Sequence, residues 1–311
     1  MGKDKSLIIS FSPHLKDSQN TSAVMLEVVI ALIPAVSAGI YFFGLNALKI
    51  ILTSILTCGI SEYLCSLLRR KPASLKNFSF LVTGILFALT LPPSLPLWIV
   101  VLGAVVCIVI GKEIFGGLGQ NVFNPALVGR AFLMASFPAQ LTNWVKPFDA
   151  TSCATPLGLW KFQSTLTNNS VLFWGNVGGC IGETSAFALL AGGIYLIIKK
   201  TADWRIPLSY LEGVMAISGT VYTFNHAYGS CFFHLLSGGV LLGALFMATD
   251  PVTCPVTKTG RFIFGSGCAI ITMVIRYVGG LPEGVMYSIL FMNALSPLIE
   301  RLTIPKPLGK K

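Results

Sequence analysis

Apolar residues form long unbroken stretches along this chain, and polar residues gather between them. Segments 24–43 and 46–68 are each long enough to cross a bilayer core of about 30 Å as a helix. Eight further apolar segments follow: 78–91, 95–111, 122–137, 178–198, 208–224, 231–249, 262–278 and 284–300. The pattern predicts an all-α polytopic membrane protein with about ten transmembrane helices.

The weakest of these segments are 78–91 and 122–137, which are short for a full crossing. We expect them to be broken or partly re-entrant. Such a conformation is tolerated inside a membrane only where protein or a cavity satisfies the backbone.

Two ten-residue stretches resemble each other. FALTLPPSLP (87–96) and FMATDPVTCP (246–255) share Phe, Thr and two Pro at equal spacing, and a Gly-Gly pair follows each at 116–117 and 279–280. The orientation predicted by the basic loops places the turn of one copy outside the membrane and that of the other inside. The pattern therefore predicts two inverted repeats.

Basic residues lie in alternate loops, and their distribution predicts the orientation. They place both termini in the cytoplasm and the loop 138–177 outside; the inside clusters are Lys3, Lys5 and Lys16, then Arg69 to Lys76, Lys112, Lys199 to Arg205, Lys258 and Arg261, and Arg301 to Lys311. The predicted division is a cytoplasmic arm (1–23), a first membrane repeat (24–137), an extracytoplasmic loop (138–177), a second membrane repeat (178–303) and a cytoplasmic tail (304–311).

Composition supports this class. Apolar residues make up 54% of the 311 residues and charged residues only 11%, against about a quarter charged in soluble domains. The net charge of +10 is spread over loops, so we expect no nucleic-acid partner. No Cys-x-x-Cys pair and no His spacing typical of a metal site occurs, and no metal site is predicted.

The predicted outer loop contains the stretch DATSCATPL (149–157). Its form D-x-x-S-C-A-T resembles the flavinylation motif D-x-x-[S/T]-G-A-T, in which a transferase esterifies the last threonine with the phosphate of FMN. Thr155 would be that threonine, and Asp149 and Ser152 would be motif residues. Cys153 stands where glycine is usual. On the loop alone, an ordinary Ser/Thr-rich connection is equally open.

Longer segments carry a resemblance to one family. They are KEIFGGLGQNVFNPA (112–126), MATDPVT (247–253) and Ser12-Pro13-His14. The chain resembles the RnfD family, the D-type subunits of the Rnf complex, which are related to the B-type subunits of the sodium-pumping NADH:quinone reductase. The resemblance implies FMN held covalently on Thr155 and riboflavin bound without a covalent link.

The same resemblance implies a function and partners. The complex would move electrons between reduced ferredoxin and NAD+ in the bacterial cytoplasmic (inner) membrane, coupled to Na+ or H+ movement. Other Rnf membrane and redox subunits and a flavin transferase would be partners. The alternative is a channel or secondary transporter built from inverted repeats, which has no evident use for the 149–155 loop.

Carboxylates near the membrane are costly and point to function. Glu113 and Asp250 lie at predicted inner ends of spans and are candidates for an ion pathway. Interfacial ion pairs with Lys112 and Lys258 are the alternative for them. Glu27 and Glu62 are expected near span ends or in contacts with other subunits.

Overall fold

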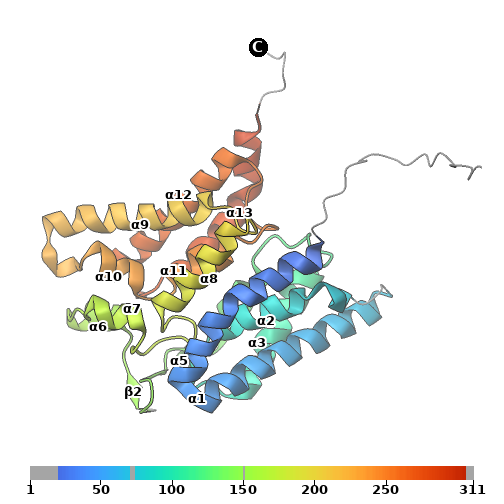
Figure 1. Ribbon diagram of the computed structural model, residues 1–311, viewed down its shortest axis with the longest axis horizontal. Coiled ribbons are helices and arrows are strands. Elements are labelled where there is room, and N and C mark those ends of the chain that lie inside the picture. Colours follow the sequence, from blue (N-terminus) through green and yellow to red (C-terminus); the bar gives the residue numbers. More distant parts are fainter. Residues whose placement is uncertain (1–19, 71–73, 150, 306–311) are drawn as a thin grey trace, which may run out of the picture.

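The computed structural model describes residues 20–70, 74–149 and 151–305, and its regular structure is almost wholly helical (Figure 1). The stretch Ser12-Pro13-His14, one of the segments that carry the family resemblance, lies outside the described residues. The α-helices are α1 (Thr21–Leu68), α2 (Ser79–Leu89), α3 (Leu97–Ile108), α4 (Pro125–Ser136), α5 (Pro138–Leu141), α6 (Pro156–Gln163), α7 (Asn169–Trp174), α8 (Ala186–Ile198), α9 (Arg205–Phe224), α10 (Cys231–Leu236), α11 (Val240–Leu242), α12 (Lys258–Tyr277) and α13 (Val285–Thr303).

Short 3₁₀ and π turns and one β-hairpin make up the remaining regular structure among the described residues. Single 3₁₀ turns occur at η1 (Ser74–Asn77) and η3 (His226–Tyr228), and single π turns at η2 (Val109–Glu113) and η4 (Gly243–Met247). Strands β1 (Trp144–Val145) and β2 (Ser152–Cys153) pair antiparallel.

Helix α1 changes direction at Gly44. This residue has φ 61° and ψ −144°, a combination that essentially only glycine adopts. Figure 1 shows α1 as two arms that meet at a sharp turn. The predicted division of this region into helices 24–43 and 46–68 is therefore confirmed.

The sequence predicts one helix over the segment 178–198, and this is wrong for its first part. Only Ala186–Ile198 is helical. The preceding residues 175–185 contain four glycines and instead dock their backbone on the end of α2. There the amides of Ile181 and Gly182 donate to the carbonyls of Leu91 at 3.0 Å and Leu89 at 2.7 Å.

Neither of the two segments expected to be broken contains a break, while their being partly re-entrant stays a prediction. The segments 78–91 and 122–137 each contain one continuous short helix, α2 and α4. The segment 231–249 is the broken one: residues 226–236 and 240–247 meet at an angle of 43°. Residues 237–239 form the break.

The two halves of the chain pack into separate helix groups. In the first, α1 contacts α2 and α3, and α3 contacts α4; in the second, α12 lies between α9 and α13. Figure 1 shows the first group on one side of the molecule and the second on the other. Helix α4 contacts α13, and α1 contacts α8, so the groups share one apolar core.

The two repeat-like stretches have one local feature in common. Each begins at the end of a helical segment, and its threonine hydroxyl donates to a carbonyl of the preceding turn. Thr90 Oγ1 bonds the Phe87 carbonyl at 2.7 Å, and Thr249 Oγ1 bonds the Leu245 carbonyl at 2.8 Å.

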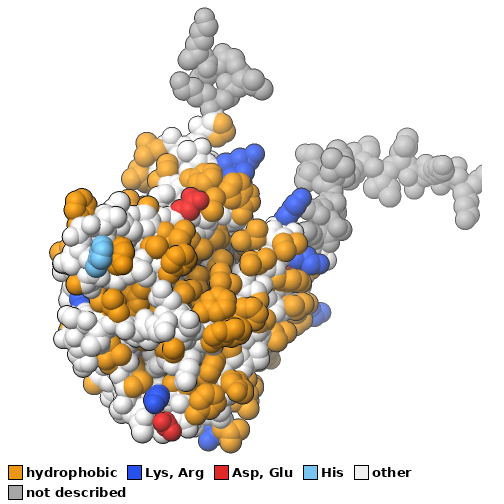
Figure 2. Space-filling view, turned by 60° about the vertical axis from the view of Figure 1, so that its left-hand side comes forward, with side chains coloured by type: hydrophobic (Ala, Val, Ile, Leu, Met, Phe, Trp, Pro, Cys, Tyr) orange, Lys and Arg blue, Asp and Glu red, His pale blue; other side chains and the backbone are white. Residues whose placement is uncertain are grey.

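The surface suits an apolar environment. Large apolar side chains are exposed along α1, including Ile33, Leu52, Leu56 and Ile60. Figure 2 shows apolar side chains over the middle of one face, with most charged ones toward its top and bottom. Among the described residues, Thr21–Leu68 and Lys258–Tyr277 are long and apolar enough to cross a membrane, and the bent pair at 226–247 makes a third if it is one span.

Candidate functional site

Thr155 is the N-cap residue of α6. Its backbone is extended, and its Oγ1 accepts a hydrogen bond from the Gly158 amide at 3.1 Å. Pro156 follows in the first turn, where its missing N–H costs nothing. A hydroxyl in this position lies at the positive end of a helix, where an attached phosphate would also be stabilised.

Helix α6 is held in place from two sides. Trp160 and Leu157 pack with Leu172 and Phe233 in a small apolar cluster. The Lys161 ammonium donates to three backbone carbonyls at the end of α12 and just beyond it, those of Ile275 at 3.3 Å, Arg276 at 2.8 Å and Leu281 at 3.0 Å. The cap that carries Thr155 is thus fixed to the end of α12.

The other motif residues lie on the hairpin that leads to Thr155. Asp149 is exposed, and its carboxylate lies 3.7 Å from the Lys146 ammonium. Ser152 and Cys153 form β2, with Ser152 exposed. Cys153 is not among the residues with positive φ, so this position does not require glycine. Burial raises the pKa of the Cys153 thiol.

Thr155 lines a small cavity of about 30 Å³, here called the Thr155 cavity. Its wall also includes Trp144, Leu236, Gly238, Glu183 and Glu283. Asp149 and Ser152 do not line it. The structure therefore brings Thr155 together with two acidic residues that are distant in sequence, and not with the rest of its motif.

Arg130 of α4 lies between those two carboxylates. Its guanidinium is 3.7 Å from the Glu183 carboxylate and 3.1 Å from the Glu283 carboxylate. Glu283 also accepts from the Gly239 amide at 2.6 Å. This cluster joins the first helix group to the second at the Thr155 cavity.

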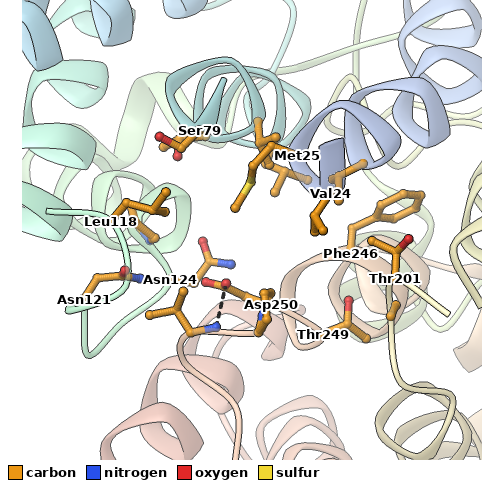
Figure 3. A pocket seen from close by; sticks show the side chains of 18 of the residues that line it. Val24, Met25, Ser79, Leu118, Asn121, Asn124, Thr201, Phe246, Thr249 and Asp250 are labelled. Atoms are coloured by element: carbon orange, nitrogen blue, oxygen red, sulfur yellow. Dashed lines mark hydrogen bonds between the residues drawn. The ribbon is translucent and has the colours of Figure 1, made fainter. Parts of the chain in front are cut away.

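A second cavity of about 80 Å³, here called the Asp250 cavity, lies between the two groups. Figure 3 shows how α1, α2, the segment 118–124, Thr201 and the segment 246–250 surround it. Apolar side chains such as Val24, Met25 and Phe246 form much of its wall. Its polar groups include Lys112, Asn121, Asn124, Thr201 and Asp250.

Asp250 is held by its own turn. Its carboxylate accepts from the Val252 amide at 3.2 Å and from the Thr253 hydroxyl at 3.4 Å. Within the described part of the chain, no ion pair joins Asp250 to Lys258. The alternative interpretation of Asp250 as half of that interfacial pair is wrong.

Glu113 is not in the Asp250 cavity, although its neighbour Lys112 is. The Glu113 carboxylate pairs with Arg69 at 2.6 Å. Lys112 instead bonds Glu62 at 2.7 Å and the Ser79 hydroxyl at 2.6 Å, and the side chains of Lys112 and Glu62 are fully buried. The expected alternative of a Glu113–Lys112 pair is therefore wrong. Glu62 lies near the end of α1, as one of its two expected positions had it, and its carboxylate is buried against Lys112.

Sequence reasoning missed Arg130, Glu183 and Glu283. A signal existed for two of them, because Arg130 and Glu183 fall inside apolar segments 122–137 and 178–198. Charged residues within such segments are rare and mark functional sites. The third, Glu283, stands just before 284–300 in a turn, where a carboxylate is ordinary.

Comparisons with known proteins give the chain a family. The family model described as "NQR2, RnfD, RnfE family" matches residues 8–309. The chain belongs to this family. It is a family of membrane proteins, so the membrane prediction and the resemblance to the D-type subunits of Rnf complexes are confirmed.

Curated relatives match along nearly their whole length. The chain is 46% identical over 305 residues, covering 96% of this chain and 94% of the relative, to the D subunit of the "Na(+)-translocating ferredoxin:NAD(+) oxidoreductase complex" of Acetobacterium woodii. It is 42% identical over 327 aligned residues, covering 99% and 98%, to the D subunit of the "Proton-translocating ferredoxin:NAD(+) oxidoreductase complex" of Clostridium ljungdahlii. It is 39% identical over 324 aligned residues, covering 92% of both, to the D subunit of the "Ion-translocating oxidoreductase complex" of Stutzerimonas stutzeri.

Proposed function

We propose that this protein is the D-type subunit of an ion-translocating ferredoxin:NAD+ oxidoreductase complex and acts as its membrane-embedded electron carrier. The observation that carries the proposal is the nearly full-length similarity to relatives with that function in their names. The chain functions with other Rnf membrane and redox subunits, which supply the remaining electron carriers. The names of the relatives favour this function over a channel or secondary transporter.

The first cofactor of the proposal is FMN, esterified to Thr155 by a flavin transferase. The residues at the point of attachment fit the phosphate of this group. The Thr155 oxygen is at the start of α6 with the Gly158 amide directed to it, and helix N-termini favour phosphate.

The charges around the Thr155 cavity support a flavin phosphate on Thr155 only because Arg130 is present. Glu183 and Glu283 alone would repel an anionic phosphate. The Arg130 guanidinium, which lies between them, offsets that repulsion. The bound ring supplies one-electron chemistry, whereas these residues set the charge beside its phosphate.

The second cofactor is riboflavin, bound without a covalent link, and we assign it to the Asp250 cavity. A flavin ring has a largely apolar body and one edge with an N–H and two carbonyl groups. The apolar walls match the body. The Asp250 carboxylate can accept from the N–H, while the amides of Asn121 and Asn124 can donate to carbonyls.

The proposed membrane topology is the one that the distribution of basic residues among the loops predicts. The ten apolar segments cross the bacterial cytoplasmic membrane as two inverted repeats, with both termini in the cytoplasm and Thr155 outside. Thr155 then meets an extracytoplasmic transferase. The Asp250 cavity lies near the cytoplasmic side, because Lys112 and Asp250 stand at inner ends of their segments.

Na+ or H+ is the translocated ion, and Glu113 and Asp250 remain the candidates for its pathway. The geometry favours Asp250 because its carboxylate faces a cavity. Glu113 is fixed by Arg69, so it would act at the margin of that pathway.

The deciding experiment is in-gel fluorescence of the denatured protein from cells that contain the flavin transferase. Wild-type protein gives a fluorescent band, and Thr155→Val, which removes the hydroxyl at nearly constant shape, gives none. Thr151→Val is the matched control, because Thr151 is an exposed hydroxyl in the same loop, and it keeps the band. A dark wild-type band, or a bright Thr155→Val band, refutes the assignment of FMN to this residue.

A further inference from the structure

The exposed face of α9 carries a carboxylate in the middle of an otherwise uncharged row. Exposed residues recur at every fourth position of this helix, and residues spaced in this way lie on one face. They are Leu208, Glu212, Ala216, Thr220 and Phe224, here called the α9 ridge. Figure 1 shows α9 at the outer edge of the second helix group. Within the described residues, the Glu212 carboxylate has no ion pair and no hydrogen bond.

The packing of α9 on α12 gives the depth of Glu212. Helix α12 is long and apolar enough to cross a membrane. A β-carbon on Gly213 would lie 2.6 Å from that of Ala269. One on Gly265 would touch the Ser209 hydroxyl. The two pairs are offset equally along the sequence, so the helices run in the same direction and Glu212 lies about halfway along α12.

A carboxylate at this depth needs a partner that the chain itself does not supply. The middle of the bilayer core is roughly 15 Å from either headgroup region, and charged side chains in spans pair with an opposite charge or face a cavity. The cations of α9 and α12 are engaged elsewhere. Arg205 and Arg261 both pair with Asp203. Arg276 donates to two backbone carbonyls.

The α9 ridge also leaves room for a second helix beside Glu212. Small side chains continue the same face toward the end of α9, at Ala216, Gly219, Thr220 and Thr223. A β-carbon on Gly219 would meet no atom within 4 Å, so no described residue covers that position. Small residues let two helices approach closely in a membrane. A helix that crosses α9 here brings its own side chains within reach of Glu212.

The exposed face of α1 shows what a lipid-facing row looks like. Leu52, Leu56 and Ile60 also recur at every fourth position, in a helix that is long and apolar enough to cross a membrane. These side chains are large and apolar, which suits contact with lipid chains. The α9 ridge differs from this row because it combines a carboxylate with small side chains.

We propose that the α9 ridge is the contact surface for a membrane helix of another subunit of the complex, and that an Arg or Lys of that helix pairs with Glu212. The inference rests on the proposed function, which gives the membrane topology and the neighbouring membrane subunits. A basic side chain supplies the charge that Glu212 lacks, and the two helices together shield the pair from lipid. A second copy of this chain fits less well, because a symmetric contact would bring two Glu212 carboxylates together.

The first test is a photo-crosslink in cells that make the whole complex. Ala216→benzoylphenylalanine should link this chain to one membrane subunit, and mass analysis should place the link in a span that contains Arg or Lys. Leu56→benzoylphenylalanine, at an exposed position of α1, is the matched control and should not link to that subunit. A link from position 216 to a second copy of the chain, or to no protein, overturns the inference.

The second test removes and then exchanges the charge in the purified complex. Glu212→Ala should lower the amount of the crosslinked subunit that co-purifies by about tenfold or more, because its basic residue is left unpaired in the membrane. Leu56→Ala should keep that amount. Glu212→Lys, combined with replacement of the basic residue of the partner helix by Glu, should restore the complex. Full co-purification with Glu212→Ala contradicts the proposed pair.

The fluorescence gel separates this inference from the proposed function. Glu212 supports no described element of the fold, so its variants should keep the covalent flavin band and the stability of the isolated chain. A wild-type chain that co-purifies with no membrane subunit would refute the proposed function itself. A variant that loses both its flavin band and its amount in the membrane has misfolded. The link from position 216, made with Glu212 intact, then decides.

Discussion

The side-chain amide of Asn124 donates a hydrogen bond to the carbonyl oxygen of Met247 at 3.1 Å, and thereby joins the two halves of the chain. The same side chain accepts from the Ala126 amide at 3.1 Å as the N-cap of α4. One residue thus begins a helix of the first group and fixes the end of η4 in the second. Both contacts are made at the wall of the Asp250 cavity.

Replacement of Asn124 should separate these two roles. Asn124→Ser keeps a capping oxygen but loses the donor to Met247, whereas Asn124→Ala loses both. We expect Asn124→Ala to cost about 1 kcal/mol more, the usual worth of a cap, and both variants to retain less extractable riboflavin. Thermal unfolding in detergent and flavin extraction measure the two effects. Equal stability of the two variants would show that the cap is unimportant.

The buried Lys112–Glu62 pair should tolerate double replacement better than single replacement. Lys112→Met or Glu62→Gln alone leaves a buried charge without its ionic partner, which typically costs about 3–5 kcal/mol. The double variant removes both charges and should recover most of that loss. Midpoints of thermal unfolding for the three variants give the comparison. Additive losses in the double variant would contradict the ionic interpretation.

Asp203 should make stability depend on pH below neutrality. Burial opposes its ionisation, but the Arg205 amide and the Arg261 guanidinium outweigh burial and hold its pKa below the usual range. Its stabilising effect is therefore complete above the unfolded pKa of about 3.9 and is lost as pH falls through the lowered folded value.

Asp203→Asn should thus lower stability at pH 7 by about 1.5–3 kcal/mol, as expected for hydrogen bonds to a charged group. The gap to wild type should shrink below about pH 4, near the unfolded pKa. Thermal midpoints measured from pH 7 downward follow this gap, and Glu212→Gln serves as the exposed control. A gap that stays constant with pH would exclude ionisation of Asp203 as its cause.

Cys153→Gly should leave flavin attachment unchanged. The position lies in β2 without positive φ, so glycine gives no conformational advantage there. Glycine inside a strand costs roughly 0.5–1 kcal/mol, and the hairpin should become slightly less stable. In-gel fluorescence and a thermal midpoint test both statements. Brighter fluorescence in the variant would mean that the thiol hinders the transferase.

Ion transport should respond more strongly to Asp250 than to Glu113. Asp250→Asn removes a charge that faces a cavity, and Glu113→Gln weakens a pair with Arg69 at the margin. We expect Asp250→Asn to lower Na+ or H+ uptake by proteoliposomes by tenfold or more, where each factor of ten corresponds to about 1.4 kcal/mol. Glu113→Gln should lower this uptake by less. Covalent fluorescence should persist in both. Normal uptake by both variants would remove these residues from the pathway.

The sequence alone predicts the local fold where hydropathy or a glycine determines the backbone conformation. The turn at Gly44 and the helices on either side of it follow directly from the apolar pattern. The irregular segment before Ala186 does not, because its residues are apolar enough for a span while its glycines favour close backbone docking on α2. Hydropathy alone does not distinguish these two conformations.

The break at 237–239 is not predictable for a different reason. Its ends are held by Arg276 and Glu283, which are some forty residues later in the chain. The Thr155 site is likewise only partly predictable from the local sequence. Thr155 itself is marked by its local motif, but the carboxylates of its cavity come from segments that only tertiary packing brings near.

The placement of Arg130 has a consequence for how the protein is made. Within the described residues, the buried or half-buried cations Arg69 and Lys112 find their acids inside the first half of the chain, whereas both acids of Arg130 belong to the second half. In the proposed topology, a nascent chain that has inserted only its first half therefore holds an uncompensated guanidinium in the bilayer. Synthesis and insertion of the second half remove that cost. The first half therefore becomes stable in the membrane only after the second half has been made.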